Sequence, residues 1–221
     1  MKNVIATWSG GKDSCLAAYK AIQSGYNVSY LANTVSKEYG RVRFHGLSAA
    51  FIQKQAAATH IPLLQEVTTA ENYRDEFKKN LSKGFLNNDI EGVVFGDIHL
   101  ADCLEWANGI CHDLGVETIE PLWHLKQEMI LKKFIDAGFE AIVVSTQASL
   151  LGQEWLGRQI DSKFFSDIKK LKDIDACGEN GEYHSAVTNG PLFRQRIKIQ
   201  NAAPLLRDGY WFLNIKKSKL I

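Results

Sequence analysis

The residues best suited to chemistry are six consecutive ones near the start of the chain: Ser9, Gly10, Gly11, Lys12, Asp13 and Ser14. They follow an apolar stretch, Asn3 to Trp8, that predicts a buried strand, and they open an amphipathic stretch, Ser14 to Gln23, that predicts a helix. Backbone N–H groups and the helix dipole attract an anion at such a junction. The glycines allow close approach, and the serines and the lysine add donors and positive charge. The segment therefore predicts a phosphate-binding loop.

Asp13 is unusual in such a loop, because a carboxylate repels phosphate. It could cap the helix and point away, or it could hold a Mg²⁺ that bridges carboxylate and phosphate. The loop does not fit the pattern G-x-x-x-x-G-K-[ST], and the chain contains no G-x-G-x-x-G. The common kinase and GTPase cradle and the dinucleotide fingerprint are therefore excluded.

A second group of reactive side chains lies far along the chain, in Cys177-Gly178-Glu179-Asn180-Gly181-Glu182-Tyr183-His184. Glu179, Glu182 and His184 could take a proton from an amine nucleophile, orient a substrate amine or bind a metal. The alternative is a solvated loop, since such residues are usually exposed. Cys177 could be a nucleophile or a small packing residue.

Two further places hold candidate site residues: the end of a predicted strand and a basic stretch. Gly96 and Asp97 end a predicted strand. Asp97 could bind Mg²⁺, as Asp13 could, it could contact the substrate, or it could cap the next helix. His45 lies in a basic stretch and could touch a phosphate or be an ordinary loop histidine. His99 and Cys103 have helical spacing but lack the further ligands that zinc requires, so packing is favoured for them.

The elements that must position these residues alternate between strand and helix over the first two-thirds of the chain. The predicted strands are 3–8, 28–35, 62–67, 92–95, 117–119 and 141–145, and the predicted helices are 14–23, 47–59, 72–86, 100–114 and 126–137. This alternation predicts an α/β fold, with a parallel sheet that binds ligands at the carboxyl ends of its strands.

The pattern changes after about Thr146, which predicts a second, smaller α+β domain. We expect one domain over residues 1–145, which binds the phosphates, and another over 146–221, which serves the second substrate. Within the latter, 150–171 has a largely helical pattern, and 196–199 and 210–215 resemble strands.

Composition limits the classes of partner. The formal net charge is +1 over 221 residues, which argues against broad binding to nucleic acid or to a membrane. The four cysteines form no C-x-x-C pair, which indicates reduced thiols and a cytoplasmic protein. The sequence leaves a monomer and a homo-oligomer both open.

The Ser9–Ser14 loop at the first strand–helix junction resembles the pyrophosphate loop of the N-type ATP pyrophosphatases. Further segments narrow the resemblance to the diphthine–ammonia ligase family. They are Arg43-Phe44-His45-Gly46, Gly96-Asp97-Ile98, Glu120-Pro121-Leu122-Trp123 and Cys177 to His184. The resemblance runs from about Val4 to Phe193. Residues 96–102 are more similar to bacterial members than to the archaeal and eukaryotic enzymes, so the acceptor stays open.

The resemblance implies a Rossmann-like fold of the adenine nucleotide alpha hydrolase type, and an enzyme that converts ATP to AMP and pyrophosphate with Mg²⁺. Its other partners would be ammonia or an amine and a carboxylate acceptor, either a small molecule or a modified protein residue. The Ser9–Ser14 loop, His45, Gly96 and Asp97 would bind the nucleotide. Lys12, Asp13, Glu179, Glu182 and His184 would serve catalysis. The competing hypothesis is a regulatory module of the same fold that binds ATP or AMP without ligation.

Overall fold

The computed structural model describes residues 1–86 and 89–221. The first part of the chain forms a parallel sheet with strand order β3-β2-β1-β4-β5. Its strands are β1 (Asn3–Thr7), β2 (Asn27–Ser36), β3 (Leu63–Thr68), β4 (Ile90–Val94) and β5 (Glu117–Ile119). The α/β class is therefore confirmed. Strand order reverses between β1 and β4, which is where ligands bind in such sheets.

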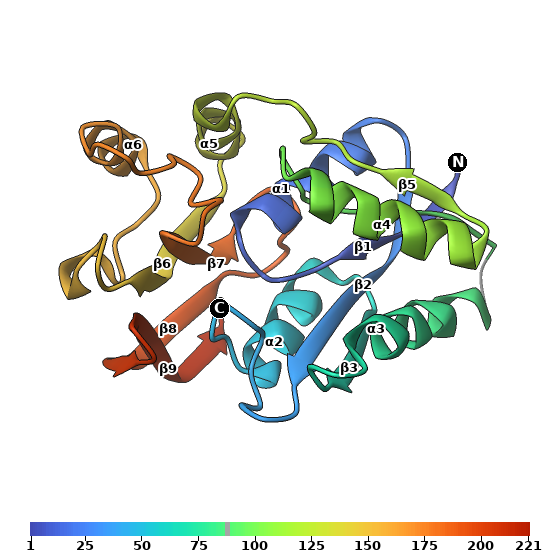
Figure 1. Cartoon of the computed structure of the whole chain (residues 1–221), viewed down its shortest axis with the longest axis horizontal. Coiled ribbons are helices and arrows are strands. Elements are labelled where there is room, and N and C mark those ends of the chain that lie inside the picture. Colours follow the sequence, from blue (N-terminus) through green and yellow to red (C-terminus); the bar gives the residue numbers. More distant parts are fainter. Residues whose placement is uncertain (87–88) are drawn as a thin grey trace.

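Helices cover both faces of this sheet (Figure 1). They are α1 (Lys12–Gln23), α2 (Ala49–Thr59), α3 (Tyr73–Ser82) with the 3₁₀ turn η1 (Lys83–Leu86), and α4 (Ala101–Leu114). Helix α5 (Gln127–Asp136) lies beyond α1, towards the second part of the chain (Figure 1). Successive side chains of β1 pack on opposite faces: Val4 and Ala6 face α1 and α2, whereas Ile5 faces α3 and α4. Because both faces are covered, the central strands β1 and β4 are largely apolar and buried.

The second part of the chain forms an antiparallel sheet with order β7-β6-β9-β8. Its strands are β6 (Glu140–Gln147), β7 (Tyr183–Asn189), β8 (Ile197–Arg207) and β9 (Tyr210–Leu220), and the last two make a long hairpin. The predicted smaller α+β unit is thus present. Within the described residues, no helix is long and apolar enough to cross a membrane.

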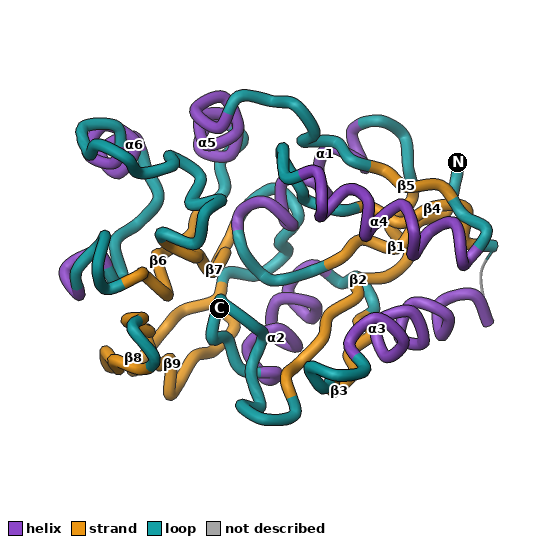
Figure 2. Tube along the Cα trace, in the orientation of Figure 1, coloured by secondary structure: helices purple, strands orange, loops and turns teal. Residues whose placement is uncertain are grey.

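Two expectations about the second unit were wrong. The strand predicted over 141–145 does not extend the parallel sheet, because β6 pairs antiparallel with β7 and β9. Residues 150–171 are mostly loop and turn, with only η2 (Gln153–Trp155) and α6 (Ser162–Ile168) (Figure 2). Gly157 adopts φ of 76°, which breaks a helical run. The chain passes from the parallel sheet to the antiparallel sheet between β5 and β6. The domain boundary at residue 145 stays a prediction.

The two sheets share one core. The larger hydrophobic cluster joins Ala18 of α1 and Phe134 of α5 to Val143 of β6 and Ala186 of β7. Two hydrogen bonds also tie the loop after β1 to β7. The Lys12 amide donates to Ser185 Oγ at 3.0 Å, and the Val187 amide donates to the Gly10 carbonyl at 2.9 Å. The loop is therefore held between the two units.

Candidate active site

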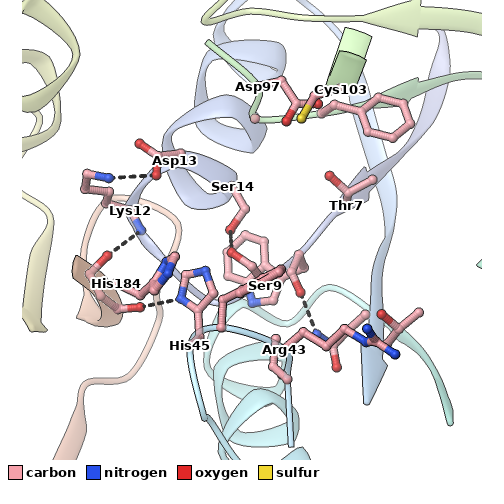
Figure 3. A pocket seen from close by; sticks show the side chains of 18 of the residues that line it. Thr7, Ser9, Lys12, Asp13, Ser14, Arg43, His45, Asp97, Cys103 and His184 are labelled. Carbon is pink, nitrogen blue, oxygen red and sulfur yellow. Dashed lines mark hydrogen bonds and ion pairs between the residues drawn. The ribbon is translucent and has the colours of Figure 1, made fainter. Parts of the chain in front are cut away.

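A cavity of about 650 Å³ lies at the carboxyl ends of β1 and β4, bordered by β7 and the loop before it. It brings together most of the predicted site residues: Ser9, Lys12, Asp13, Ser14, His45, Gly96, Asp97, Glu179 and His184. Figure 3 shows Asp13 and Asp97 on one side of this cavity, with His45 and Arg43 on the other. Gly10 and Gly11 belong to the loop but do not line the cavity, and neither does Glu182.

The loop is held by its own hydroxyls and by a buried glutamine. Ser9 Oγ and Ser14 Oγ lie 3.1 Å apart, and the Gly11 amide donates to Ser9 Oγ at 3.3 Å. Gly10 adopts φ of 83°, a conformation that costs other residues steric strain. Its carbonyl accepts a hydrogen bond from Gln55 Nε2 at 2.9 Å. The loop is thus pre-organised by its surroundings.

Gly96 permits the close approach of β4 to the start of α1. A Cβ atom at this position would lie 3.0 Å from both the Asp13 carbonyl carbon and the Ser14 nitrogen. The glycine therefore lets the strand end reach the loop, and it places Asp97 beside Asp13.

The Lys12 side chain is buried and does not project freely into the cavity. Its ammonium donates to Asp13 Oδ2 at 2.8 Å and to the Cys177 carbonyl. Burial lowers the pKa of Lys12, but the negative charges of Asp13 and neighbouring groups outweigh it and raise the pKa well above its ordinary value. Lys12 therefore stays charged and links the loop to the second unit.

Asp13 and Asp97 do not cap helices. The N-cap of α1 is Gly11 and that of α4 is Leu100, so the capping alternatives are wrong. Asp13 Oδ1 is buried without a hydrogen-bond partner in the described part of the chain. Burial and the charge of Asp13 raise the pKa of Asp97. The two carboxylates thus repel each other in a poorly solvated place.

Glu179 lines the cavity, and its surroundings raise the pKa of its carboxyl group. Burial, followed by the charge of Asp13, raises the pKa of Glu179 from 4.5 to about 8, and Lys12 opposes this shift. A carboxyl group with a pKa near neutrality can both accept and donate a proton during a reaction. The solvated-loop alternative does not describe this residue, which is part of the cavity wall.

Glu182 holds the loop together and is not placed in the cavity. Its carboxylate accepts from the Asp175 amide at 2.8 Å, the Asn180 amide at 3.0 Å and Asn180 Nδ2 at 3.1 Å. The side chain is buried, with 1% of the residue exposed. The solvated-loop alternative is therefore wrong for Glu182, which is buried and organises the turn. A role in contact with substrate is not supported for Glu182, because its oxygens are turned to the loop backbone.

His45 and His184 form a small aromatic stack with Phe44. The ring centroids of His45 and His184 are 4.8 Å apart, and those of Phe44 and His184 are 6.0 Å apart. His45 Nδ1 lies 2.9 Å from the Ser185 carbonyl, so this nitrogen carries the proton and Nε2 is left for another partner. Burial lowers the pKa of both histidines, that of His184 strongly. Both rings are therefore neutral near pH 7.

The cysteines near the cavity are poor nucleophiles. Cys177 is buried and its thiol contacts the Gln127 carbonyl at 3.0 Å. Burial raises the pKa of Cys177 well above its ordinary value, which leaves little of the reactive thiolate. The packing alternative thus describes Cys177. Cys103 lines the cavity, and burial raises the pKa of its thiol too.

Sequence reasoning missed several residues that shape the site. Gln55 is fully buried; besides Gly10 it bonds the Val187 carbonyl at 2.7 Å and Trp8 Nε1 at 3.0 Å. In the sequence it is one more polar residue of a predicted helix. Glu120 lies close enough to Asp97 for their charges to interact. One wall of the cavity is aromatic and consists of Tyr73, Phe77, Phe95 and Trp106. Of these residues, only Glu120 could have been found from the sequence, because it belongs to the Glu120-Pro121-Leu122-Trp123 motif of the family resemblance.

A parallel sheet with a phosphate-type loop at its switch point defines a nucleotide-binding α/β protein. The comparisons with known proteins are more specific. Residues 1–118 match the family described as diphthamide synthase N-terminal domain, and residues 126–221 match diphthamide synthase C-terminal domain. The chain belongs to the diphthamide synthase family, which confirms the resemblance drawn from its motifs.

Individual relatives carry the corresponding name. A diphthine–ammonia ligase of Schizosaccharomyces pombe is 28% identical over 89% of this chain, which spans 36% of that relative's length. The human diphthine–ammonia ligase is 26% identical over 93% of this chain, which spans 85% of the relative. A crystal structure titled as a predicted subunit of a tRNA methyltransferase from Methanocaldococcus jannaschii shares 14% identity. The structural match covers 86% of this chain and 98% of the other chain, with a TM-score of 0.46.

Proposed function

We propose that the chain is an ATP-dependent ligase that joins a carboxylate to ammonia or an amine and releases AMP and pyrophosphate, as the name of its relatives implies. The observation that carries the proposal is that the phosphate loop and Glu179, which come from different units, line one cavity. Adenylation and amide formation need both a phosphate site and a proton acceptor at one place. A purely regulatory nucleotide module needs no second group of this kind, so that hypothesis is not favoured.

The first step would form the activated acceptor. An oxygen of the acceptor carboxylate attacks the α-phosphorus of ATP, the bond from that phosphorus to the bridging oxygen breaks, and pyrophosphate leaves. Residues Ser9–Ser14 would bind the pyrophosphate through the start of α1, and the Lys12 charge would offset part of the negative charge. The protein contributes positioning and electrostatic stabilisation to this step.

The second step would form the amide. The amine nitrogen attacks the acyl carbon, the carbon–oxygen bond to AMP breaks, and the nitrogen loses a proton. Glu179, with its pKa of about 8, is the proposed acceptor of that proton. The surrounding walls from the second unit would limit access of water, which hydrolyses adenylates.

We further propose that Asp13 and Asp97 hold a Mg²⁺ during the reaction. The unpartnered Oδ1 of Asp13 and the repulsion between the two carboxylates fit a cation at this place. In the described chain no group of three or more His, Cys, Asp or Glu residues converges on one point. The remaining ligands would be phosphate oxygens and water, as Mg²⁺ prefers. The ion would neutralise phosphate charge.

The cytoplasm is the proposed location, because Cys15, Cys103, Cys111 and Cys177 are all free thiols. Fractionation of cells that express the chain with its own termini would test this. Recovery of the protein in an oxidising compartment would contradict it.

Product analysis tests the reaction. Purified protein is incubated with ATP, Mg²⁺, ammonium and a panel of carboxylate acceptors, and nucleotides are separated by chromatography. We expect AMP and pyrophosphate in equal amounts, dependent on the acceptor. We expect Lys12→Ala and Asp13→Ala to lower AMP formation strongly, because they remove charge beside the phosphates. Steady release of ADP by the wild type, or unchanged turnover in both variants, would contradict the proposal.

A further inference from the structure

Helix α1 begins without a capping side chain of its own. Its N-cap is Gly11, and no side chain bonds the helix start from that position. A Cβ atom added to Gly11 would overlap the His45 ring and lie 3.2 Å from the Ser185 carbonyl oxygen. A serine or threonine, the usual caps, therefore does not fit there. The first amide of α1 has to find its partner in another part of the chain.

Ser185 of β7 provides that partner. Its hydroxyl oxygen accepts from the Lys12 amide, the first of α1, at 3.0 Å, although the two residues are 173 positions apart. Ser185 is 2% exposed, so its side chain has little room to turn. The nearby bond from the Val187 amide to the Gly10 carbonyl, at 2.9 Å, fixes β7 along the loop. The hydroxyl is therefore held at the start of α1 by the surrounding backbone.

The proton of this hydroxyl has no acceptor in the protein. A serine hydroxyl can accept and donate at the same time, and the bond from the Lys12 amide uses only its accepting side. Among residues 1–86 and 89–221, none accepts a hydrogen bond from Ser185 Oγ. Ser185 also belongs to the wall of the cavity at the phosphate loop. The hydroxyl proton is thus available to a molecule bound in this cavity.

The surroundings of this hydroxyl favour an anionic oxygen as its acceptor. The start of α1 carries positive partial charge, and the Lys12 amide polarises the hydroxyl to which it donates, because hydrogen bonds in a chain strengthen one another. In an ordinary anion site the first amides of a helix donate directly to the phosphate. Here the Ser185 hydroxyl stands between the first amide and the cavity, so it takes over the role of that amide.

We propose that Ser185 is a pyrophosphate-binding residue that the second unit contributes to the nucleotide site. Its hydroxyl donates to a non-bridging oxygen of the β- or γ-phosphate of ATP and passes on the polarisation of the Lys12 amide. Tight binding of the pyrophosphate half of ATP then requires β7 to lie against the loop. The inference rests on the proposed function for the identity of the anion, since pyrophosphate is the product that leaves in the first step.

Calorimetry with two probes tests this contact without turnover. The full chain and its variants are titrated with pyrophosphate and with adenosine, which carries no phosphate, in the presence of Mg²⁺. Ser185→Ala should weaken pyrophosphate binding by about tenfold or more, the scale for a hydrogen bond to a charged group, and should leave adenosine binding unchanged. Ser185→Thr keeps the hydroxyl and should bind pyrophosphate like the wild type. If Ser185→Ala does not fold, Ser185→Cys replaces it with the same expectation, because a thiol is a weak donor.

Ser145→Ala is the matched control. Ser145 lies on the neighbouring strand β6, opposite His184 in the register, and it is fully buried. Its hydroxyl has no hydrogen-bond partner in the described part of the chain, and it does not line the cavity. Its removal should therefore leave pyrophosphate affinity unchanged. Equal losses of pyrophosphate affinity in Ser145→Ala and Ser185→Ala would assign the effect to packing between the strands and overturn the proposal.

Thermal unfolding of the same variants separates binding from stability. A Ser185→Ala protein that unfolds at a lower temperature but binds pyrophosphate like the wild type overturns the proposal, and so does an equal loss of affinity for pyrophosphate and adenosine. If the wild type forms no AMP with any acceptor, while its pyrophosphate affinity depends on the Ser185 hydroxyl, the proposed function is overturned and the role of Ser185 stands. If the wild type forms AMP but its pyrophosphate affinity is independent of Ser185, only the role of Ser185 is overturned.

Discussion

At the scale of single residues, Glu179 and Glu182 are three positions apart but face different surroundings. Glu179 lines the cavity, whereas Glu182 binds the loop backbone. Glu179→Gln should leave the thermal midpoint near that of the wild type and lower amide formation by about 10²-fold, since it removes a proton acceptor. Glu182→Gln should lower the free energy of unfolding by about 1–3 kcal/mol, because the amide NH₂ would face backbone donors.

Thermal unfolding and acceptor-dependent AMP release, measured on both variants, check this pair. Each variant is the control for the other, because both replace a carboxylate by an amide of the same size in one loop. A Glu182→Gln protein of normal stability that no longer forms the amide would give Glu182 a catalytic role after all.

Glu120 should make stability depend on pH. Burial, followed by the charge of Asp97, raises the pKa of Glu120 from 4.5 to about 8, and neither carboxylate oxygen has a well-formed hydrogen bond to any described residue. The unfolded chain releases this proton near pH 4.5, whereas the folded chain keeps it until about pH 8. The unfolded state therefore binds fewer protons in this window, and stability falls as pH rises through it.

Urea unfolding of the wild type and of Glu120→Gln, at several pH values in this window, measures the effect. We expect the wild type to lose about 1–2 kcal/mol more than the variant as pH rises, after allowance for the partial exposure of the group. Glu179 titrates in both proteins, so the difference isolates Glu120. Parallel curves for the two proteins would show that the Glu120 carboxyl is better solvated than its position implies.

At the scale of elements, α2 supports the phosphate loop through Gln55. This side chain bonds the Gly10 carbonyl, the Val187 carbonyl and Trp8 Nε1, and so connects the loop, β7 and the residue that follows β1. Gln55→Ala would leave these buried groups unpaired and open a cavity, at a cost of about 2–4 kcal/mol. Affinity for ATP should fall as well, because Gly10 loses its support.

Gln53→Ala is the matched control for this variant. It lies on the same helix, but Gln53 is exposed and bonds only Gln65 Oε1 among the residues described, at 2.9 Å. We expect its stability and ATP affinity to stay near those of the wild type, measured by urea unfolding and calorimetry. Equal losses of stability and ATP affinity in both variants would mean that helix α2 as a whole, rather than the Gln55 side chain, supports the phosphate loop.

At the scale of the whole molecule, the two sheets share one core, so we expect them to unfold together. The larger cluster includes residues of α1, α5, β6 and β7. Hydrogen exchange in β1 and in β6 should therefore give the same free energy of opening. A clearly lower free energy of opening in β6 than in β1 would show that the second unit opens by itself.

The amino-acid sequence by itself determined the local features of this protein. The Ser9–Ser14 loop, the alternation of strands and helices, and the parallel sheet follow from short-range patterns, because apolar periodicity and glycine content act within a few residues. The family could also be inferred from its motifs, and the family match confirmed it. That Glu179 and the phosphate loop belong to one site was predicted, and the structure places both on one cavity.

Only the tertiary structure decided which polar side chains face the cavity and which serve the fold. Gln55 has no local signature, since its partners lie in the loop after β1 and in β7, which meet it only after folding. The partners of Glu182 are in its own loop, but only the folded structure shows that its oxygens turn to that loop and away from the cavity. The sheet to which β6 belongs was equally undetermined, because a short apolar strand carries no record of its partners. The β8–β9 hairpin likewise packs against the turn after β2, where Arg41 bonds Asn214 across more than 160 residues. Contacts over such separations depend on the packing of the whole chain, and so they could not be predicted from any segment alone.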